Sequence, residues 1–352
     1  MRRLSLALLL IGGLALGGCS THEVRFEGDV PPQPLSPQER VDTAHEIIRT
    51  LLDHFAQSGR RVPPSAAAPF AEAAVLDAQA THSLASAADA RRLGRSLLGG
   101  RIPVGVGLAY PGADGRTPDP QVTVEVARTL LTLSQVLQGP HYRPAAARVA
   151  QAIITSRMGW TRLRDGYAVR EPGARRRYSV ALTAEAGVVL ARLAAVGGGP
   201  LAERYANSAL GTVRRAQIAP GRWHKSLGGN GPMPVAERSL TLFALHASPS
   251  KPDQDIATGA LPNLFEETFQ PWGEPRDAKL VGKRGIGVAL ALRTLYLEPG
   301  TSISEHVTRW FVTHRRSDGT FEAAAPDDAV AQAYFALAFG YRAYIYAKGG
   351  LP

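Results

Sequence analysis

Apolar residues recur along most of this chain at the spacing of an α-helix. Steps of three and four residues, which place side chains on one helix face, link Val122, Val126, Leu130, Leu133 and Leu137. The same spacing, with apolar residues over most of the helix circumference, occurs in 178–196, 236–247, 285–297 and 327–347. Helices with that pattern are buried on more than one side. Since no segment shows a convincing alternation of apolar and polar residues, we expect an all-α fold.

Amphipathic helices alternate with these apolar helices, and an aromatic residue stands in a turn of each repeat. The amphipathic segments are 144–156, 200–216, 261–269 and 302–314. The aromatic residues are Tyr110, Trp160, Trp223, Trp272 and Phe321. Their successive spacings are 50, 63, 49 and 49 residues. A period near 50 residues with two helices per unit indicates a repeat architecture.

The helix hairpins are expected to close into a ring. An open array of repeats needs polar terminal caps, whereas the last helix, 327–347, is among the most apolar in the chain. We expect the first helix, 36–58, to cover it. With that helix included, six inner helices are expected to begin near residues 38, 122, 178, 235, 279 and 327.

The aromatic turns before the inner helices, "GRWHKSL" and "DGTFEA" above all, give the body a family resemblance. It resembles the six-hairpin (α/α) toroid superfamily, which includes glycoside hydrolases, sugar epimerases and polysaccharide lyases. The resemblance covers most of the chain after residue 100 and implies an (α/α)6-type toroid with a polysaccharide in its funnel. One fold supports many activities, so the resemblance selects none of them by itself.

The N-terminus has the pattern of a secretory signal. Two arginines precede an apolar run and the small residues of "LGGC", which resembles the bacterial lipobox. Cys19 is the only cysteine in the chain, so we expect it to be lipidated and to hold the protein on the periplasmic side of the envelope, with the outer membrane favoured. The expected organisation is a signal at 1–18, a proline-rich tether at 19–35 and one toroid domain at 36–352, which begins with the capping box "SPQE".

The charge balance favours an anionic partner. Removal of the signal leaves 38 basic and 30 acidic residues, a net charge of +8. Charge of this size attracts acidic polysaccharide or lipid headgroups, and no cluster of basic and aromatic residues indicates a nucleic-acid module. The histidines show no metal-ligand spacing, and no dinucleotide or phosphate-loop motif occurs, so neither a metal nor another cofactor is expected.

Candidate chemistry is concentrated in the loops that lead into the inner helices, because those loops ring one mouth of a toroid. The candidate catalytic residues are Glu237, Asp277, Tyr178 and His224. The candidate substrate-binding residues are Arg177, Trp223, Lys225, Asn230, Arg238 and Trp272.

Two chemistries fit these residues. Glycosidic hydrolysis needs a carboxylic acid with a raised pKa and a second carboxylate; the eligible acids are Glu237, Asp277, Glu322, Asp327 and Asp328. A uronate lyase or epimerase needs positive groups around the substrate carboxylate and a Tyr or His that moves a proton. Tyr178 beside three arginines, with His224 on the next loop, suits that role.

Structural explanations exist for the same residues. Asp327 and Asp328 stand where a helix cap is expected, and Glu237 with Arg238 could be an ion pair. The aromatic turns could fill the space between hairpins. The alternative to an enzyme is therefore a non-catalytic envelope lipoprotein that binds glycan or partner proteins.

Overall fold

The computed structural model describes residues 35–59, 62–99, 101–112, 114–171, 173–276, 285–298 and 301–349. Cys19 and Asp277 lie outside these residues. Within them, twelve α-helices alternate between an outer and an inner layer. The outer helices are α1 (Pro37–Gln57), α3 (Leu84–Leu97), α5 (Tyr142–Ile153), α7 (Pro200–Arg215), α9 (Lys251–Thr268) and α11 (Ser302–Thr313). The inner helices are α2 (Pro64–Thr81), α4 (Pro120–Leu137), α6 (Val180–Leu193), α8 (Val235–His246), α10 (Gly285–Leu295) and α12 (Ala329–Lys348).

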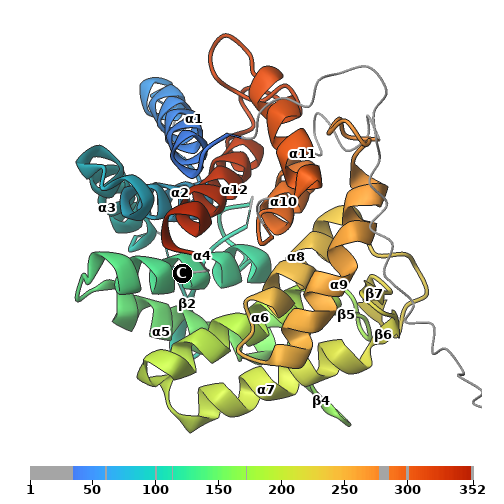
Figure 1. Ribbon diagram of the computed structural model, residues 1–352. Helices are drawn as coiled ribbons and strands as arrows, with labels where there is room; N and C mark the ends of the chain where they lie inside the picture. The colour runs from blue at the N-terminus through green and yellow to red at the C-terminus, as the bar shows by residue number, and fades with distance from the viewer. Residues whose placement is uncertain are drawn as a thin grey trace, which may run out of the picture. The chain divides into compact units, whose positions relative to one another are not determined.

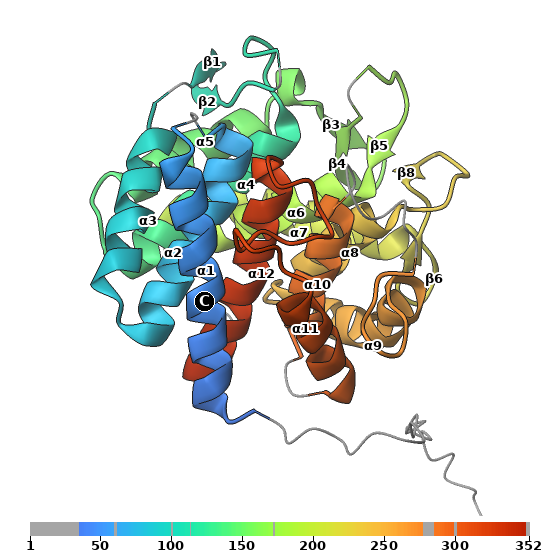
Figure 2. The same ribbon diagram turned by 90° about the horizontal axis from the view of Figure 1, so that it is seen from above.

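The six inner helices form a closed ring (Figure 1). Each inner helix packs against the next in chain order, and α12 packs against α2 to complete the circle. The prediction of an (α/α)6-type toroid is therefore confirmed. We define the mouth as the end of the ring at which the chain enters the inner helices, and the base as the opposite end; Figure 2 shows the ring from the side.

The first inner helix is α2, which corrects the expectation that the ring begins with the helix near residue 38. α2 is rich in alanine and is buried at every position from Ala66 to Asp77. α1 is amphipathic and packs from outside on α12 and α2. The expected covering of the last helix by the first is thus confirmed, although α1 belongs to the outer layer.

Short strands in the segments before the inner helices are the main departure from a purely helical fold. They are β1 (Ile102–Val104), β2 (Gly107–Ala109), β3 (Trp160–Leu163), β4 (Gly166–Arg170), β5 (Tyr178–Ser179), β6 (Gln217–Ala219), β7 (Arg222–Trp223) and β8 (Ser226–Leu227). Runs of two to five residues are too short for an alternating pattern to be detected. One antiparallel sheet has the order β3-β4-β5-β8, in which Ser179 pairs with Ser226. This pairing joins the loop before α6 to the loop before α8.

Glycines in the turns allow each repeat to pack closely on the following outer helix. A Cβ atom on Gly221 would lie 2.1 Å from the Cβ of Ala260 on α9, and one on Gly319 would lie 2.1 Å from Thr50 Cγ2 on α1. Both glycines also have positive φ angles, which other residues rarely adopt. The contact of Gly319 with α1 joins the last repeat to the first. The close contact of Gly221 with α9 gives the glycine of "GRWHKS" a structural role.

The stretch Val180–Gly198, which is α6 followed by the π-helical turn η2 (Ala194–Gly198), is long and apolar enough to cross a membrane by composition alone. In the toroid, 67% of the window that meets this test is buried, and α6 packs against α4 and α8. Its apolar character therefore has an explanation in the inner ring.

Candidate functional site at the mouth and axis of the toroid

Four of the five aromatic residues in the repeated turns are buried: Tyr110, Trp160, Trp223 and Phe321. The indole N–H of Trp223 donates a hydrogen bond to the Val213 carbonyl oxygen at 2.9 Å. This burial corrects the expectation that Trp223 contacts substrate and agrees with the space-filling alternative. Trp272 is the exception, because it is 53% exposed, and its N–H donates to Glu274 Oε2 at 3.0 Å.

Glu237 and Lys225 form an ion pair at the mouth. Glu237 lies in the first turn of α8, and Lys225 lies between β7 and β8, with Nζ 3.4 Å from Glu237 Oε1. The next residue, Ser226, donates a hydrogen bond to Glu171 Oε1 at 2.5 Å. Arg177 Nε lies 3.9 Å from the other oxygen of Glu171. We refer to Glu171, Arg177, Lys225, Ser226 and Glu237 as the mouth cluster; Tyr178 adjoins it on β5.

The mouth cluster contains one carboxyl group whose affinity for protons is increased. Burial raises the pKa of Glu237 above its usual value, repulsion from Glu171 raises it further, and Lys225 lowers it. The side chains of Glu237 and Glu171 are 26% and 17% exposed, so solvent reaches both. A partly buried acid beside a second carboxylate is the arrangement that acid catalysis of glycosidic cleavage requires.

The remaining predicted residues have other surroundings. His224 is partly buried and its backbone pairs with Pro232, while Asn230 is exposed in the same turn. Arg238 is buried and its guanidinium pairs with Glu267 of α9. Because adjacent helical residues point about 100° apart, Glu237 faces the mouth cluster while Arg238 faces the outer layer. Asp328 accepts a hydrogen bond from the Ala331 N–H at 3.0 Å, so it caps α12.

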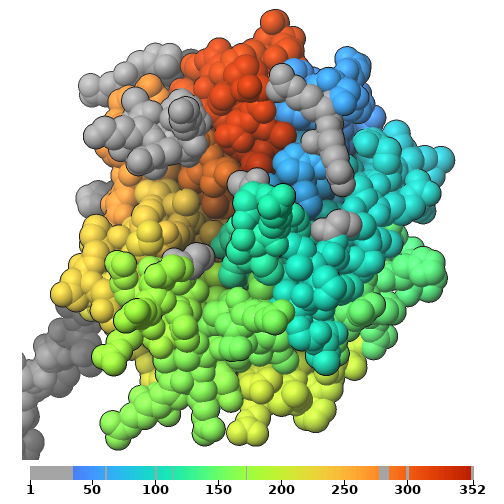
Figure 3. All heavy atoms as spheres, turned by 180° about the vertical axis from the view of Figure 1, so that it is seen from behind, coloured from blue at the N-terminus to red at the C-terminus, as the bar shows by residue number. Residues whose placement is uncertain are grey.

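A groove of about 570 Å³ lies at the mouth beside this cluster. Its walls come from the turn before α4, the 3-10 turn η1 (Ser156–Met158) and the end of β4, and they include Arg157, Arg170 and Glu171. Figure 3 shows the mouth face, where the teal segment before α4 lies next to the green segment that contains η1 and β4. Since Glu171 belongs to both the groove and the mouth cluster, a ligand in the groove would reach the cluster.

Below the mouth, charged side chains fill the axis of the ring. Arg128 of α4 contacts three buried carboxylates: Nη2 lies 3.0 Å from Glu125, Nε lies 3.1 Å from Glu72 of α2, and Nη1 lies 3.4 Å from Glu185 of α6. The hydroxyls of Tyr341 and Tyr334 on α12 donate to Glu72 and Glu125. We call Glu72, Glu125, Arg128, Glu185, Arg293, Tyr334 and Tyr341 the axial cluster.

The three axial carboxyl groups differ in their affinity for protons. Burial raises the pKa of Glu125 to about 7. Attraction to Arg128 lowers this pKa, but repulsion from Glu185 offsets part of that attraction. Burial likewise raises the pKa of Glu185. Burial also opposes ionisation of Glu72, but Arg128, Arg192 and the Tyr341 hydrogen bond together lower its pKa. Glu125 therefore gains and loses its proton near neutral pH, next to an ionised Glu72.

The sequence pattern predicted a site in the loops and did not predict this cluster. A signal was nevertheless present in "AEAAVL", "VEVARTLL", "TAEAGVVL" and "LALRTL", where one or two charges interrupt helices that are otherwise apolar. A charge on a helix buried all round must find a partner inside the protein. In the part of the chain that the structure describes, no three His, Cys, Asp or Glu side chains converge as a metal site would require.

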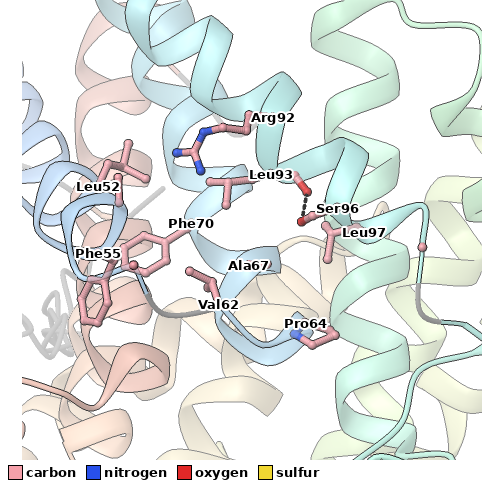
Figure 4. A pocket seen from close by; sticks show the side chains of 13 residues that line it. Leu52, Phe55, Val62, Pro64, Ala67, Phe70, Arg92, Leu93, Ser96 and Leu97 are labelled. Atoms are coloured by element: carbon pink, nitrogen blue, oxygen red, sulfur yellow. Dashed lines mark hydrogen bonds between the residues drawn. The ribbon is translucent and has the colours of Figure 1, made fainter.

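A further cavity, of about 330 Å³, lies between α1, α2 and α3 (Figure 4). Its walls are mostly apolar, with Phe55, Phe70 and Leu93 around it. Arg92 is at its edge and pairs with Asp89 at 2.8 Å. None of the predicted site residues lines this cavity, and its walls are less polar than those of the groove at the mouth.

The fold defines a class of protein, the six-hairpin (α/α) toroids. Two solved structures that are similar to this chain are family 76 glycoside hydrolases. One is a mannosidase from Bacteroides thetaiotaomicron, with a TM-score of 0.67 and 11% identity over 87% of this chain and 98% of the other. The second is an inactive α-1,6-mannanase variant from Salegentibacter with bound α-1,6-mannotriose, with a TM-score of 0.62 and 10% identity over 85% of this chain and 99% of the other. A family 88 glycosyl hydrolase from Bacteroides vulgatus is similar over 88% of this chain and 99% of its own, with a TM-score of 0.59 and 12% identity. No family model and no curated protein matches the sequence. At these identities the likeness establishes the fold.

Proposed function

We propose that this protein binds an acidic polysaccharide in the groove at the mouth of the toroid. The observation that carries the proposal is the solvent-open groove that contains Arg157 and Arg170 and leads to the mouth cluster. Arg175, Arg176 and Arg177 are exposed directly after the groove residues Gly173 and Ala174. The bound mannotriose in a neighbour of the same fold supports a saccharide as the ligand.

Each of the three carboxylates that line the groove already has a hydrogen-bond or ion-pair partner within the protein: Glu171 is held in the mouth cluster, and the other two are held by their own loop. The arginines are therefore the charged groups that can donate hydrogen bonds to an anionic ligand. Asp114 accepts hydrogen bonds from the backbone N–H groups of Arg116 and Thr117, both at 2.9 Å. Asp119 caps α4 through the N–H groups of Gln121 and Val122. An anionic glycan would therefore meet Arg157 and Arg170 as donors of charge-assisted hydrogen bonds.

The double substitution Arg157→Gln and Arg170→Gln should weaken binding of polygalacturonate or alginate by about a hundredfold or more, because each of the two charged hydrogen bonds contributes about 1.5–3 kcal/mol. Binding measured by affinity electrophoresis should also weaken as salt is added. The matched control is Arg91→Gln with Arg204→Gln, which removes two exposed charges from outer helices. Equal affinities of the two double variants would contradict the proposed groove.

Hydrolysis of the bound glycan is the second candidate function, favoured by the raised pKa of Glu237 beside Glu171. Glu237 would give its proton to the glycosidic oxygen as the carbon–oxygen bond breaks. Glu171 would activate the attacking water or attack the sugar carbon itself. The mouth cluster contains no adjacent aspartates like those replaced in the inactive mannanase variants. The one adjacent Asp pair in this sequence, Asp327 and Asp328, directly precedes α12.

If the mouth cluster is hydrolytic, Glu237→Gln should abolish the release of reducing ends from the glycan that the groove binds and leave the affinity nearly unchanged. General acid catalysis typically contributes about 10²–10⁴-fold to a rate. Glu203→Gln, at an exposed position of α7, is the matched control. Binding without any product from the wild-type protein would instead favour the non-catalytic alternative.

We also propose that the protein works as a periplasmic lipoprotein held by Cys19, on the basis of the signal and lipobox-like sequence. Cys19→Ala should move the protein from the membrane fraction to the soluble periplasmic fraction, since the acyl chains supply the membrane affinity. Fractionation followed by immunoblotting measures this, and unchanged partitioning would refute the anchor.

A further inference from the structure

A second cavity opens at the base of the ring, at the opposite end from the groove. Its volume is about 160 Å³, and it lies among α4, α6, α8 and α12. Its polar lining consists of Arg128, Gln135, Glu185, Arg192 and Tyr341, and Phe243 provides an aromatic wall. Figure 1 shows α4, α6, α8 and α12 around the middle of the ring. Pockets for drug-sized ligands have volumes of about 300–1,000 Å³. The smaller volume of this cavity therefore suits a smaller molecule.

The base cavity has a graded polar lining. Arg192 and Gln135 lie near the ends of α6 and α4, and Arg192 is partly exposed. Arg192 Nη2 donates to Gln135 Oε1 at 2.7 Å and to Thr132 Oγ1 at 3.2 Å. Arg128, Glu185 and Tyr341 are buried at the inner end. A ligand would therefore meet Arg192 first and the axial cluster last.

One member of the axial cluster has unused hydrogen-bond donors close to this cavity. Arg293 of α10 is fully buried, and none of its three guanidinium nitrogens has a hydrogen-bond partner among the described residues. Its guanidinium carbon lies 3.9 Å from the ring centroid of Phe243, the aromatic wall of the base cavity. A buried cation without hydrogen bonds is costly unless an anion compensates it.

We propose that the base cavity binds a small organic carboxylate no larger than a monosaccharide. Arg192 donates to the carboxylate, and the Phe243 ring packs against the carbon skeleton. Arg128 supplies positive charge in the wall at the inner end, and Arg293, which does not line the cavity, adds positive charge over the Phe243 ring. Three arginines, Arg128, Arg192 and Arg293, face three carboxyl groups along the axis, and proton uptake by one of those groups leaves the region net positive. The site is separate from the groove, so it does not depend on the proposed polysaccharide function.

The test is isothermal titration of the full chain with sodium D-glucuronate, sodium acetate and D-glucose. We expect a carboxylate to bind and neutral glucose not to bind. Arg192→Gln should weaken the binding by about tenfold or more, as expected for loss of a charged hydrogen bond. Arg204→Gln removes an exposed charge at the start of α7 and should have no effect. Ala247→Phe fills the cavity without changing its charge and should abolish binding of the carboxylate.

The proposal would be overturned by no binding of either carboxylate to the wild-type protein, by equal affinities of wild type and Arg192→Gln, or by glucose binding as well as glucuronate. Circular dichroism of each variant separates loss of the site from loss of the fold. The double variant Arg157→Gln and Arg170→Gln should bind the carboxylate normally. Loss of carboxylate binding in that variant alone would place the site at the mouth and refute the base cavity.

Discussion

Replacement of Arg128 by methionine should lower the free energy of unfolding at neutral pH by about 3–5 kcal/mol, the usual cost of removing one partner from a buried ion pair. Arg128 is the one side chain that contacts Glu72, Glu125 and Glu185 together in the described part of the structure. Without it, these buried carboxylates repel one another. Urea unfolding followed by circular dichroism measures the change.

The other buried arginine of the axial cluster provides the matched control. Arg293→Met removes a guanidinium that makes no hydrogen bond to a described residue. Burial and repulsion from Arg128 both lower the pKa of this guanidinium. Its replacement by an apolar side chain of similar length should change stability by less than about 1 kcal/mol, since the desolvation cost disappears with the charge. The Arg128→Met defect should also shrink as the pH falls and the carboxylates take up protons. Equal losses in the two variants would show that volume, not charge, determines the effect.

The wild-type protein should lose about 3 kcal/mol of stability between about pH 5 and pH 8, because Glu125 holds its proton more tightly when folded. Its pKa is about 7 in the folded state against a usual value of 4.5. Between those values the folded state binds more protons than the unfolded state, so stability falls as the pH rises. The raised pKa of Glu185 acts in the same direction, and the lowered pKa of Glu72 acts only at lower pH.

Glu125→Gln should flatten this pH dependence, because glutamine resembles the protonated acid, and the variant should be more stable than wild type near pH 8. The groups that face Glu125 remain in place: Arg128, Glu185, Arg293 and Tyr334. Free energies of unfolding at several pH values measure the slope. Glu266→Gln, at an exposed position of α9, should retain the wild-type slope. A slope unchanged in Glu125→Gln would show that Glu125 is ionised throughout this range.

Much of the fold was predictable from local pattern. The period of the apolar residues in 122–137 identified an inner helix, and "SPQE" identified the start of α1, where Ser36 and Glu39 form the expected capping box. The first inner helix was assigned wrongly because α2 is rich in alanine, so its apolar residues show little periodic contrast. The four-stranded sheet was missed because its pairings join strands of two repeats over very short lengths.

Less of the site was predictable. The sequence brought Glu237, Lys225 and Arg177 into the candidate set, and the structure places all three in the mouth cluster. Trp223 was included because aromatic rings often bind sugars, but its burial depends on the fit of its turn against α7 and α9. The axial cluster unites residues from α2, α4, α6, α10 and α12, and their separation along the chain conceals the contact.

The sequence by itself determined the local features of this protein: the helical repeat, the position of its turns, the basic charge balance and the pattern at its N-terminus. Each of these depends on residues within a few turns of one another. Only the tertiary structure decided which charges meet, because Glu72, Arg128 and Glu185 come together through closure of the ring. It also decided which aromatic residues are buried and where the groove and the base cavity lie, since both depend on packing between helices that are distant in the chain.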